Sequence, residues 1–273
     1  MGLFELFGMG AARADLPDAR APRLARADAF FQGQPLALLH AALAGDAAQA
    51  RQLVAQGVDP NSHGPASVSK AVPQLTLLNY ATGVQNERAM AIVLAAGADP
   101  LFEPREDDGD AFLFAIVRHD AKMLDVLFRL FPLSRVPPKR QSDNAFAALR
   151  FGANDCVKVM FEHGMPPGIQ DSRHYNLFME SLNLENFDVA EWLLVDIKVP
   201  LNDAVTVLGV TPANMVQRAL DEVFRPGSPT YKRYEKFKRI MEQKGIVFPV
   251  ETVLEYRARI KAQSAPPAGS ASR

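Results

Sequence analysis

The amino-acid sequence predicts an all-α fold, a solenoid of about six helix-turn-helix units with an extra C-terminal capping helix. The peptide AQGVDPN at residues 55–61 returns as AAGADP at residues 95–100, each time after a run rich in Leu, Val and Ala. Aligned on these glycines, successive second helices end at Gly57, Gly97, Phe131, Gly164 and Ile197. A repeat period of about 33 residues fits this spacing and indicates stacked helix pairs, because one pair cannot bury its apolar face alone.

The repeat frame divides the chain into four segments. Residues 1–34 are rich in Ala, Arg, Asp and Pro with weak periodicity, which predicts a flexible or weakly helical arm. Residues 35–248 form the repeat domain, residues 249–263 a last helix that covers the exposed end of the stack, and residues 264–273 a disordered tail. The copies lie near residues 35–61, 75–100, 110–133, 143–166, 176–200 and 211–248.

The repeated hexapeptide is expected to stop a helix. Glycine at the end of a second helix adopts the left-handed conformation at little cost, and the aspartate that follows accepts backbone hydrogen bonds in the turn. Pro60 and Pro100 prevent the helix from resuming. The third copy has Phe131 in place of the glycine and Pro132 after it, so this helix must end differently, with a remodelled loop.

Apolar spacing predicts how the pairs pack. Small residues allow helices to approach closely, and they recur on the first helices at Ala41, Ala42, Ala81 and Ala115. In the least regular sixth copy, an apolar stripe runs along the second helix through Tyr231, Tyr234, Phe237 and Met241.

These residues resemble the ankyrin repeat family, whose period is about 33 residues and whose unit is a β-turn plus two helices. The family's Thr-Pro-Leu-His pattern has its nearest copies in TLLN (residues 76–79) and TPAN (residues 211–214). The family's Gly-Ala-Asp is kept at residues 97–99 and as Gly-Val-Asp at residues 57–59. His40 falls one place after the family's histidine position, which is Leu39 here, and copies three to five have lost most of the signature.

The resemblance implies a non-catalytic protein that binds another protein through its concave face and turn loops. An Ala- and Arg-rich stand-alone chain is similar to bacterial ankyrin proteins, some of which are immunity proteins that neutralise a cognate toxin of type VI secretion, such as a lipase. An ankyrin effector secreted to bind a host protein is the alternative. An enzyme with an unrecognised site also stays open, although the sequence has no His-Glu-x-x-His pair, Gly-x-Ser-x-Gly elbow or phosphate-binding glycine loop.

Composition narrows the partners. Lys and Arg number 30 and Asp and Glu 31, so a formal net charge of -1 gives no basic excess for binding nucleic acid. No run reaches the ~18 apolar residues of a membrane span, and we expect no membrane insertion. The single cysteine, Cys156, excludes a disulfide framework within the chain and a cysteine-only zinc site, and its helix predicts a buried structural thiol. We expect no cofactor, a monomer, and a cytoplasmic location, or a periplasmic one if MGLFELFGMGAARA is an atypical signal.

The repeat frame also selects candidate binding residues on the first helices. Aromatic residues and Arg are favoured at interface hot spots. The predicted patch consists of Tyr80, Phe114, Arg118, Arg150 and Phe151, with His40 and Asn183 at equivalent positions. The alternative for Phe114 and Phe151 is that they pack between repeats.

Two loops are further candidates. The interval from Gly57 to Gly97 is longer than the later ones, which places an insertion within residues 62–74 that serves binding or is a tolerated surface loop. The acidic segment EPREDDGD at residues 103–110 lacks the ligand spacing of a calcium loop. It predicts a solvated acidic tip or one that meets a basic partner.

Overall fold

The computed structural model describes residues 24–64, 74–105, 108–201 and 205–264, and these residues are mostly helical. The predicted all-α class is confirmed. Two short antiparallel strands, β1 (His63–Gly64) and β2 (Leu75–Thr76), are the exception; β1 lies near the start of the segment predicted to hold the insertion, and β2 directly follows that segment. Contacts divide the chain into two compact units, residues 1–165 and residues 166–273. Each unit is described by itself.

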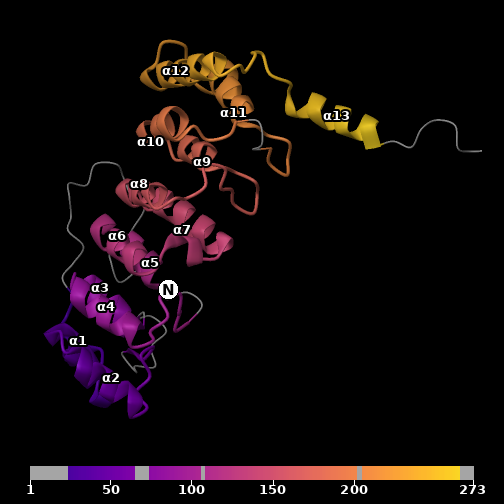
Figure 1. The fold of residues 1–273 in the computed structure, drawn as a ribbon. Coiled ribbons are helices and arrows are strands. Elements are labelled where there is room, and N and C mark those ends of the chain that lie inside the picture. The colour runs from indigo at the N-terminus through magenta and orange to yellow at the C-terminus, as the bar shows by residue number, and fades with distance from the viewer. Residues whose placement is uncertain (1–23, 65–73, 106–107, 202–204, 265–273) are drawn as a thin grey trace, which may run out of the picture. The chain divides into compact units, whose positions relative to one another are not determined.

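Unit 1 consists of four helix pairs in chain order (Figure 1). Each first helix contacts the next first helix, and each second helix contacts the next second helix. The pairs are α1 (Gly33–Ala44) with α2 (Ala47–Ala55), α3 (Leu77–Gly83) with α4 (Glu87–Ala95), α5 (Ala111–Val117) with α6 (Ala121–Leu130), and α7 (Pro138–Arg150) with α8 (Asn154–Glu162). Two 3-10 turns, η1 (Ala27–Ala29) and η2 (Leu133–Arg135), precede α1 and follow α6.

Polar side chains begin most of these helices. A side-chain oxygen that accepts a backbone N–H in the first turn satisfies a donor that the helix itself cannot. In unit 1 such caps are provided by Asp46, Thr76, Asn86, Asp110 and Asp120.

The repeated hexapeptide is a helix stop, as predicted. Gly57 and Gly97 have φ angles of 96° and 105°, which a residue with a Cβ adopts only with strain. Asp59 Oδ1 accepts the N–H of Asn61 at 2.8 Å, and Asp99 Oδ1 accepts that of Leu101 at 2.9 Å. Asn61 Oδ1 in turn accepts the N–H of Asp99 at 2.8 Å, so that consecutive turns are joined.

The C-terminal carbonyl groups of α1 are capped by the following pair. Asn86 Nδ2 donates to the carbonyl oxygen of Leu43 at 3.4 Å, and Arg88 Nη2 donates to that of Gly45 at 2.7 Å. A helix end that lacks partners within its own chain segment therefore obtains them from the neighbouring pair.

The interior of unit 1 is formed by side chains of both the first and the second helices. Ala41, Ala42, Ala81 and Ala115 are buried, which confirms the expected close approach. At the end of α6, Phe131 is extended, with φ −137°, and Pro132 leads into η2. The prediction that this helix ends without a left-handed residue is therefore confirmed.

Unit 2 contains α9 (Leu177–Asn183), α10 (Phe187–Trp192), α11 (Pro212–Arg218), α12 (Pro229–Gln243) and α13 (Val253–Ser264). Single wide turns, η3 (Leu193–Ile197) and η4 (Ala219–Val223), extend α10 and α11. The predicted stripe on α12 is buried at Tyr234, Phe237 and Met241 and half-buried at Tyr231.

Two predicted terminal segments need correction. Helix α13 forms where the last helix was expected, but the side chains of Leu254 and Ile260 are 78% and 42% exposed, so it does not bury an apolar face as a cap must. In the predicted N-terminal arm, residues 24–34 pack on the first two pairs instead of remaining free. Residues 1–23 of the arm and 265–273 of the tail lie outside the described residues.

Candidate binding surface

The seven predicted binding residues are divided between the two units. His40, Tyr80, Phe114, Arg118, Arg150 and Phe151 belong to the first helices of unit 1 and the turns that end them. Asn183 ends α9 in unit 2 and is described there.

Three of the unit 1 residues are buried, which corrects their predicted role in contacting a partner directly. Tyr80, Phe114 and Arg118 are 5%, 0% and 8% exposed. Phe114 and Arg118 lie at the contact of α5 with α3, where a Cβ atom at Gly83 would be 3.2 Å from the Phe114 ring, so the alternative that Phe114 packs between repeats is confirmed. Arg118 lies over the Phe114 ring at 5.5 Å, and its Nη2 is 3.5 Å from the carbonyl oxygen of Gly83. Burial lowers the pKa of this guanidinium.

Tyr80 is buried by the protein's own N-terminal segment. Its hydroxyl donates a hydrogen bond to the carbonyl oxygen of Ala25 at 3.0 Å, and the rings of Phe30 and Phe31 lie 5.9 Å from its ring. Burial is the main cause of the raised pKa of Tyr80, followed by the negative charge of Asp28. No pattern in the sequence indicates this contact, because residues 1–34 have weak periodicity.

The remaining unit 1 residues stay accessible. His40 and Arg150 are exposed, and Phe151 is half-buried. Arg150 extends over the buried ring of Phe146 at 5.8 Å. The accessible part of the predicted patch in unit 1 is therefore mostly polar, and Phe151 is its half-buried aromatic residue.

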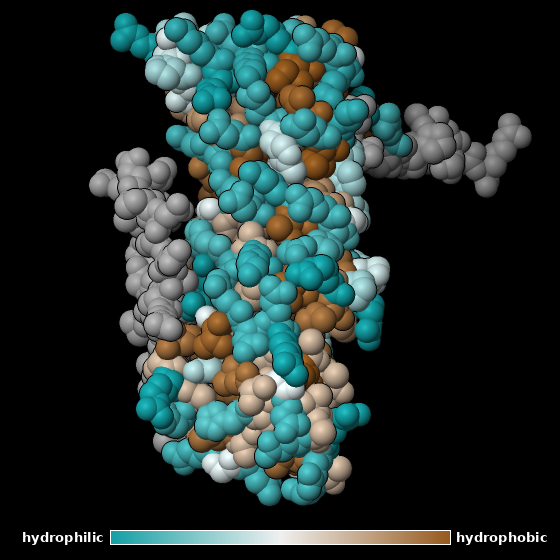
Figure 2. All heavy atoms as spheres, turned by 60° about the vertical axis from the view of Figure 1, so that its left-hand side comes forward, coloured by the Kyte–Doolittle hydropathy of each residue, from teal (hydrophilic) through white to brown (hydrophobic). Residues whose placement is uncertain are grey.

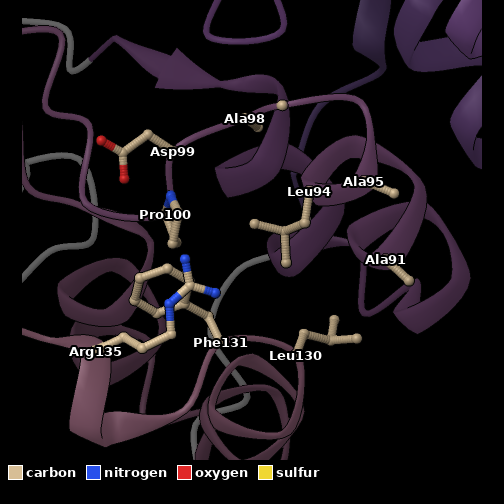
Figure 3. A pocket seen from close by; sticks show the side chains of 10 residues that line it. Ala91, Leu94, Ala95, Ala98, Asp99, Pro100, Leu130, Phe131 and Arg135 are labelled. Carbon is tan, nitrogen blue, oxygen red and sulfur yellow. The ribbon is translucent and has the colours of Figure 1, made fainter.

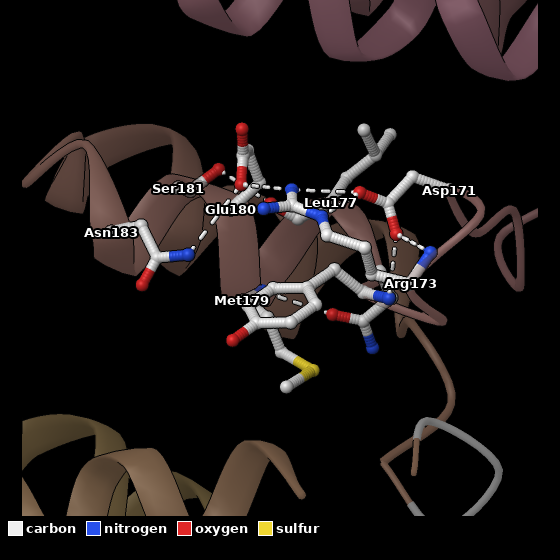
Figure 4. Close-up of polar contacts among 9 residues, drawn as sticks. Asp171, Arg173, Leu177, Met179, Glu180, Ser181 and Asn183 are labelled. Carbon is white, nitrogen blue, oxygen red and sulfur yellow. Dashed lines mark hydrogen bonds and ion pairs between the residues drawn. The ribbon is translucent and has the colours of Figure 1, made fainter. Parts of the chain in front are cut away.

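In unit 2, Asn183 at the end of α9 contacts a cluster of charged residues formed by Glu180 and by the turn before this helix (Figure 4). Its Nδ2 donates to Glu180 Oε2 at 3.5 Å. Arg173 lies between two carboxylates, with Nη2 at 2.7 Å from Asp171 and 3.5 Å from Glu180. The hydrogen bond from Arg173 to Asp171 raises the pKa of the guanidinium.

The cluster is built by a local turn. Asp171 Oδ1 accepts the N–H groups of Arg173 and Tyr175, which brings the Arg173 side chain back over the buried Glu180. Because the guanidinium is already shared by two carboxylates, the cluster is best explained as the neutralisation of a buried charge. Asn183 itself remains exposed.

The described acidic residues between positions 103 and 110 are buried or half-buried, which corrects the predicted solvated tip for these residues. Asp108 is paired with Arg105 at 2.8 Å, and Glu103 with Arg140 at 2.5 Å. Asp110 is fully buried and caps α5 through the N–H of Leu113. Burial raises its pKa to about 6, although Arg140 Nε lies 3.5 Å away. Glu106 and Asp107 lie outside the described residues.

Residues that could support catalysis or hold a metal have structural environments. Cys156 is buried, which raises the pKa of its thiol to about 12 and confirms the predicted structural role. His163 Nε2 lies 2.8 Å from Asp125 Oδ1 at the surface of unit 1. In the part of the chain that the structure describes, no three His, Cys, Asp or Glu side chains gather as a metal site would require.

A hollow of about 500 Å³ lies beside the turn after α4 (Figure 3). Leu94 and Leu130 point into it from α4 and α6, and Arg135 lies along the ring of Phe131 beside Pro100. The Arg135 carbon Cζ is 4.3 Å from the ring centroid. The hollow is lined by Ala91, Leu94, Ala95, Gly97, Ala98, Asp99, Pro100, Leu130, Phe131 and Arg135.

The hollow combines exposed apolar area with an accessible cation. Leu130 is 38% exposed, Phe131 is half-buried and Arg135 is exposed. Within the described residues, no carboxylate forms an ion pair with Arg135. Elsewhere, the face shown in Figure 2 is mostly hydrophilic, with apolar side chains in small separate patches. The missing glycine at position 131 was the sequence signal for this site, because it indicated a remodelled loop there.

No family model matches the chain, and no curated protein is significantly similar to it. Of the helices in the described residues, none combines the length and the apolar character needed to cross a membrane.

Proposed function

We propose that this protein is a non-catalytic binding module of ankyrin type that recognises another protein. The spacing of helix stops supports an ankyrin-like arrangement, as do the contacts of first helices with first helices and of second helices with second helices in unit 1. The observation that carries the proposed function is the hollow beside Phe131, where aromatic, aliphatic and Arg side chains are accessible together.

The chemistry of the hollow defines what a partner would present. An apolar side chain would fill the space between Leu94, Leu130 and Phe131, which removes apolar surface from water on both sides. A carboxylate next to it would pair with Arg135, whose planar guanidinium binds such groups with two hydrogen bonds. Stacking on Phe131 holds that guanidinium in place, which reduces the entropy lost on binding.

Within this proposal, the partner is a cognate secreted toxin and the protein is its immunity protein. The support is the resemblance of the chain to bacterial stand-alone ankyrin proteins, some of which neutralise type VI secretion effectors. The proposal expects a stoichiometric complex with a protein encoded by a neighbouring gene, and protection of cells that produce the toxin.

The test is affinity purification of the tagged full chain from its native cells, followed by titration with the purified partner. Arg135→Glu should weaken binding about tenfold or more, because it places a negative charge against the partner's carboxylate. Arg51→Glu is the matched control, since Arg51 is exposed on α2 and away from the hollow. Both variants should melt as the unchanged chain does.

Three outcomes separate the parts of the proposal. If no partner co-purifies and no toxin is neutralised, the function as a binding module is wrong. A partner that binds Arg135→Glu and Phe131→Ala normally but loses affinity with Arg150→Glu binds the first-helix surface, not the hollow. Secretion of this chain itself, together with binding to a host protein, would replace the immunity role with that of an effector.

A further inference from the structure

The segment Leu24–Phe31, which we name the strap, lies across the first helices of the first two pairs. Phe31 packs edge-on against Tyr80, with an angle of 86° between the rings. Phe31 and Ala27 are buried, and Leu24 and Phe30 are half-buried. The strap therefore covers part of the surface on which the sequence predicted a partner to bind.

Gly83 of α3 and Gly64 of β1 have no side chain in the space that the strap occupies. A Cβ atom at Gly83 would collide with the Leu24 side chain and lie 3.2 Å from Cε1 of Phe114. A Cβ atom at Gly64 would collide with the carbonyl oxygen of Phe30. Neither glycine has a left-handed backbone, so the close approach of the strap explains both of them.

The backbone of the strap forms a turn closed by its own hydrogen bonds. Its backbone hydrogen bonds are internal, from the N–H of Ala29 to Arg26 and from the N–H groups of Phe30 and Phe31 to Ala27. Among the described residues, one hydrogen bond joins the strap to the helix pairs, and the Tyr80 hydroxyl donates it to the carbonyl oxygen of Ala25. Attachment through side chains, without a backbone ladder, is how a short peptide ligand is held in a groove.

The connection to α1 allows the strap to leave. Gln32 is extended, and Gly33 has a φ of 58° with no atom within 4 Å of the position that a Cβ would occupy. A pivot of this kind absorbs backbone rotation without disturbing the helix that follows it.

We propose that the face of α1 and α3, with Phe114 of α5 beneath it, is a peptide-binding site whose exchangeable internal ligand is the strap. A partner segment of the same chemistry takes its place: a leucine and a small residue on one turn, followed by a phenylalanine at the spacing Leu-x-x-Ala-x-x-x-Phe. The site is separate from the hollow beside Phe131 and does not depend on it. The strap, present in every copy of the chain, competes with such a partner.

The test uses the full chain and a fluorescent peptide with the sequence of residues 24–33. In the unchanged chain the strap occupies the site at a high effective concentration, so the peptide should bind weakly. The double substitution Leu24→Ala and Phe31→Ala weakens the strap, and the peptide should then bind at least about tenfold more tightly, measured by fluorescence anisotropy. Adding Tyr80→Phe should reduce that affinity about fivefold, the usual effect of one lost hydrogen bond. A peptide with the same two alanines is the control and should not bind.

A second variant tests the strap without changing it. Gly83→Ala should displace Leu24, so the amides of Ala29, Phe30 and Phe31 should exchange hydrogen at least about tenfold faster. Gly168→Ala in unit 2, whose Cβ atom would meet only Pro200 at 3.5 Å, is the control and should leave the exchange of these amides unchanged. Two results overturn the proposal: the peptide binds none of the folded variants, or the double alanine variant loses its cooperative melting transition, which would make the strap part of the core.

Discussion

Two Phe–Arg pairs with the same spacing have opposite environments in unit 1. Phe114 and Arg118 on and after α5 are buried, whereas Phe131 and Arg135 after α6 are accessible. The guanidinium lies over the ring in both pairs, at 5.5 Å and 4.3 Å. A first-helix aromatic such as Phe114 faces the neighbouring first helix, but an aromatic at the position of the helix-ending glycine follows the last turn, where the Phe131 ring lies 6.2 Å from that of Phe112 and stays half-buried. The position in the repeat, not the residue type, decides which pair a partner can reach.

The largest test of this comparison is the substitution of each phenylalanine by alanine. Phe114→Ala should lower the free energy of unfolding by about 3 to 5 kcal/mol, because it leaves a cavity between first helices. Phe131→Ala should lower it by about 1 kcal/mol, since its ring is only half-buried. Urea denaturation measures both. Similar losses for the two variants would show that the environments do not differ as described.

Asp110 caps α5, the helix that carries Phe114 of the buried pair, and its ionisation gives a pH-dependent test of this environment. Its pKa of about 6 in the folded protein exceeds the ordinary value of 3.8, so the folded state binds this proton more tightly. The protonated Asp110 carboxyl therefore contributes its full stabilisation of the folded state below pH 3.8, and this contribution is lost as the pH rises to about 6. Asp110→Asn keeps an oxygen that can cap α5 and removes the buried charge.

We therefore expect Asp110→Asn to gain stability relative to the unchanged chain between about pH 4 and about pH 7.5, by at most about 3 kcal/mol. The measurement is the difference in unfolding free energy between the two proteins at each pH. An equal difference at both pH values would mean that Arg140 compensates the charge of Asp110 completely.

A smaller effect than that of Asp110 is expected at Gly97, which occupies in the second copy the position that Phe131 holds in the third. Gly97→Ala should cost about 1 to 2 kcal/mol, because a φ of 105° is unfavourable for a residue with a Cβ. Gly168→Ala is the control, since Gly168 is not left-handed and its Cβ would meet only Pro200, at an ordinary 3.5 Å. Equal melting temperatures for Gly97→Ala and the unchanged chain would show that the stop does not require glycine.

Local features of the fold could be predicted from the sequence because they depend on adjacent residues. The glycine stops, the aspartates that bond within their turns and the irregular end at Phe131 all arise within a few positions of the chain. The alanines between first helices follow from the repeat itself.

The binding surface could not be predicted to the same extent, because its burial depends on distant residues. Tyr80 is covered by Ala25, 55 positions earlier, and Glu103 is neutralised by Arg140, 37 positions later. Neither partner belongs to the repeat pattern. Helix α13 shows the converse, because its sequence specifies a helix but not whether another element covers it.

The capping of α1 by Asn86 and Arg88 has a consequence for synthesis on the ribosome. The chain emerges from its N-terminus, so α1 is complete before the residues that bond to its last carbonyl groups exist. Until the second pair is made, the carbonyl oxygens of Leu43 and Gly45 have water as their partner in place of Asn86 and Arg88. A chain that stops after α2 would never gain these two side-chain donors.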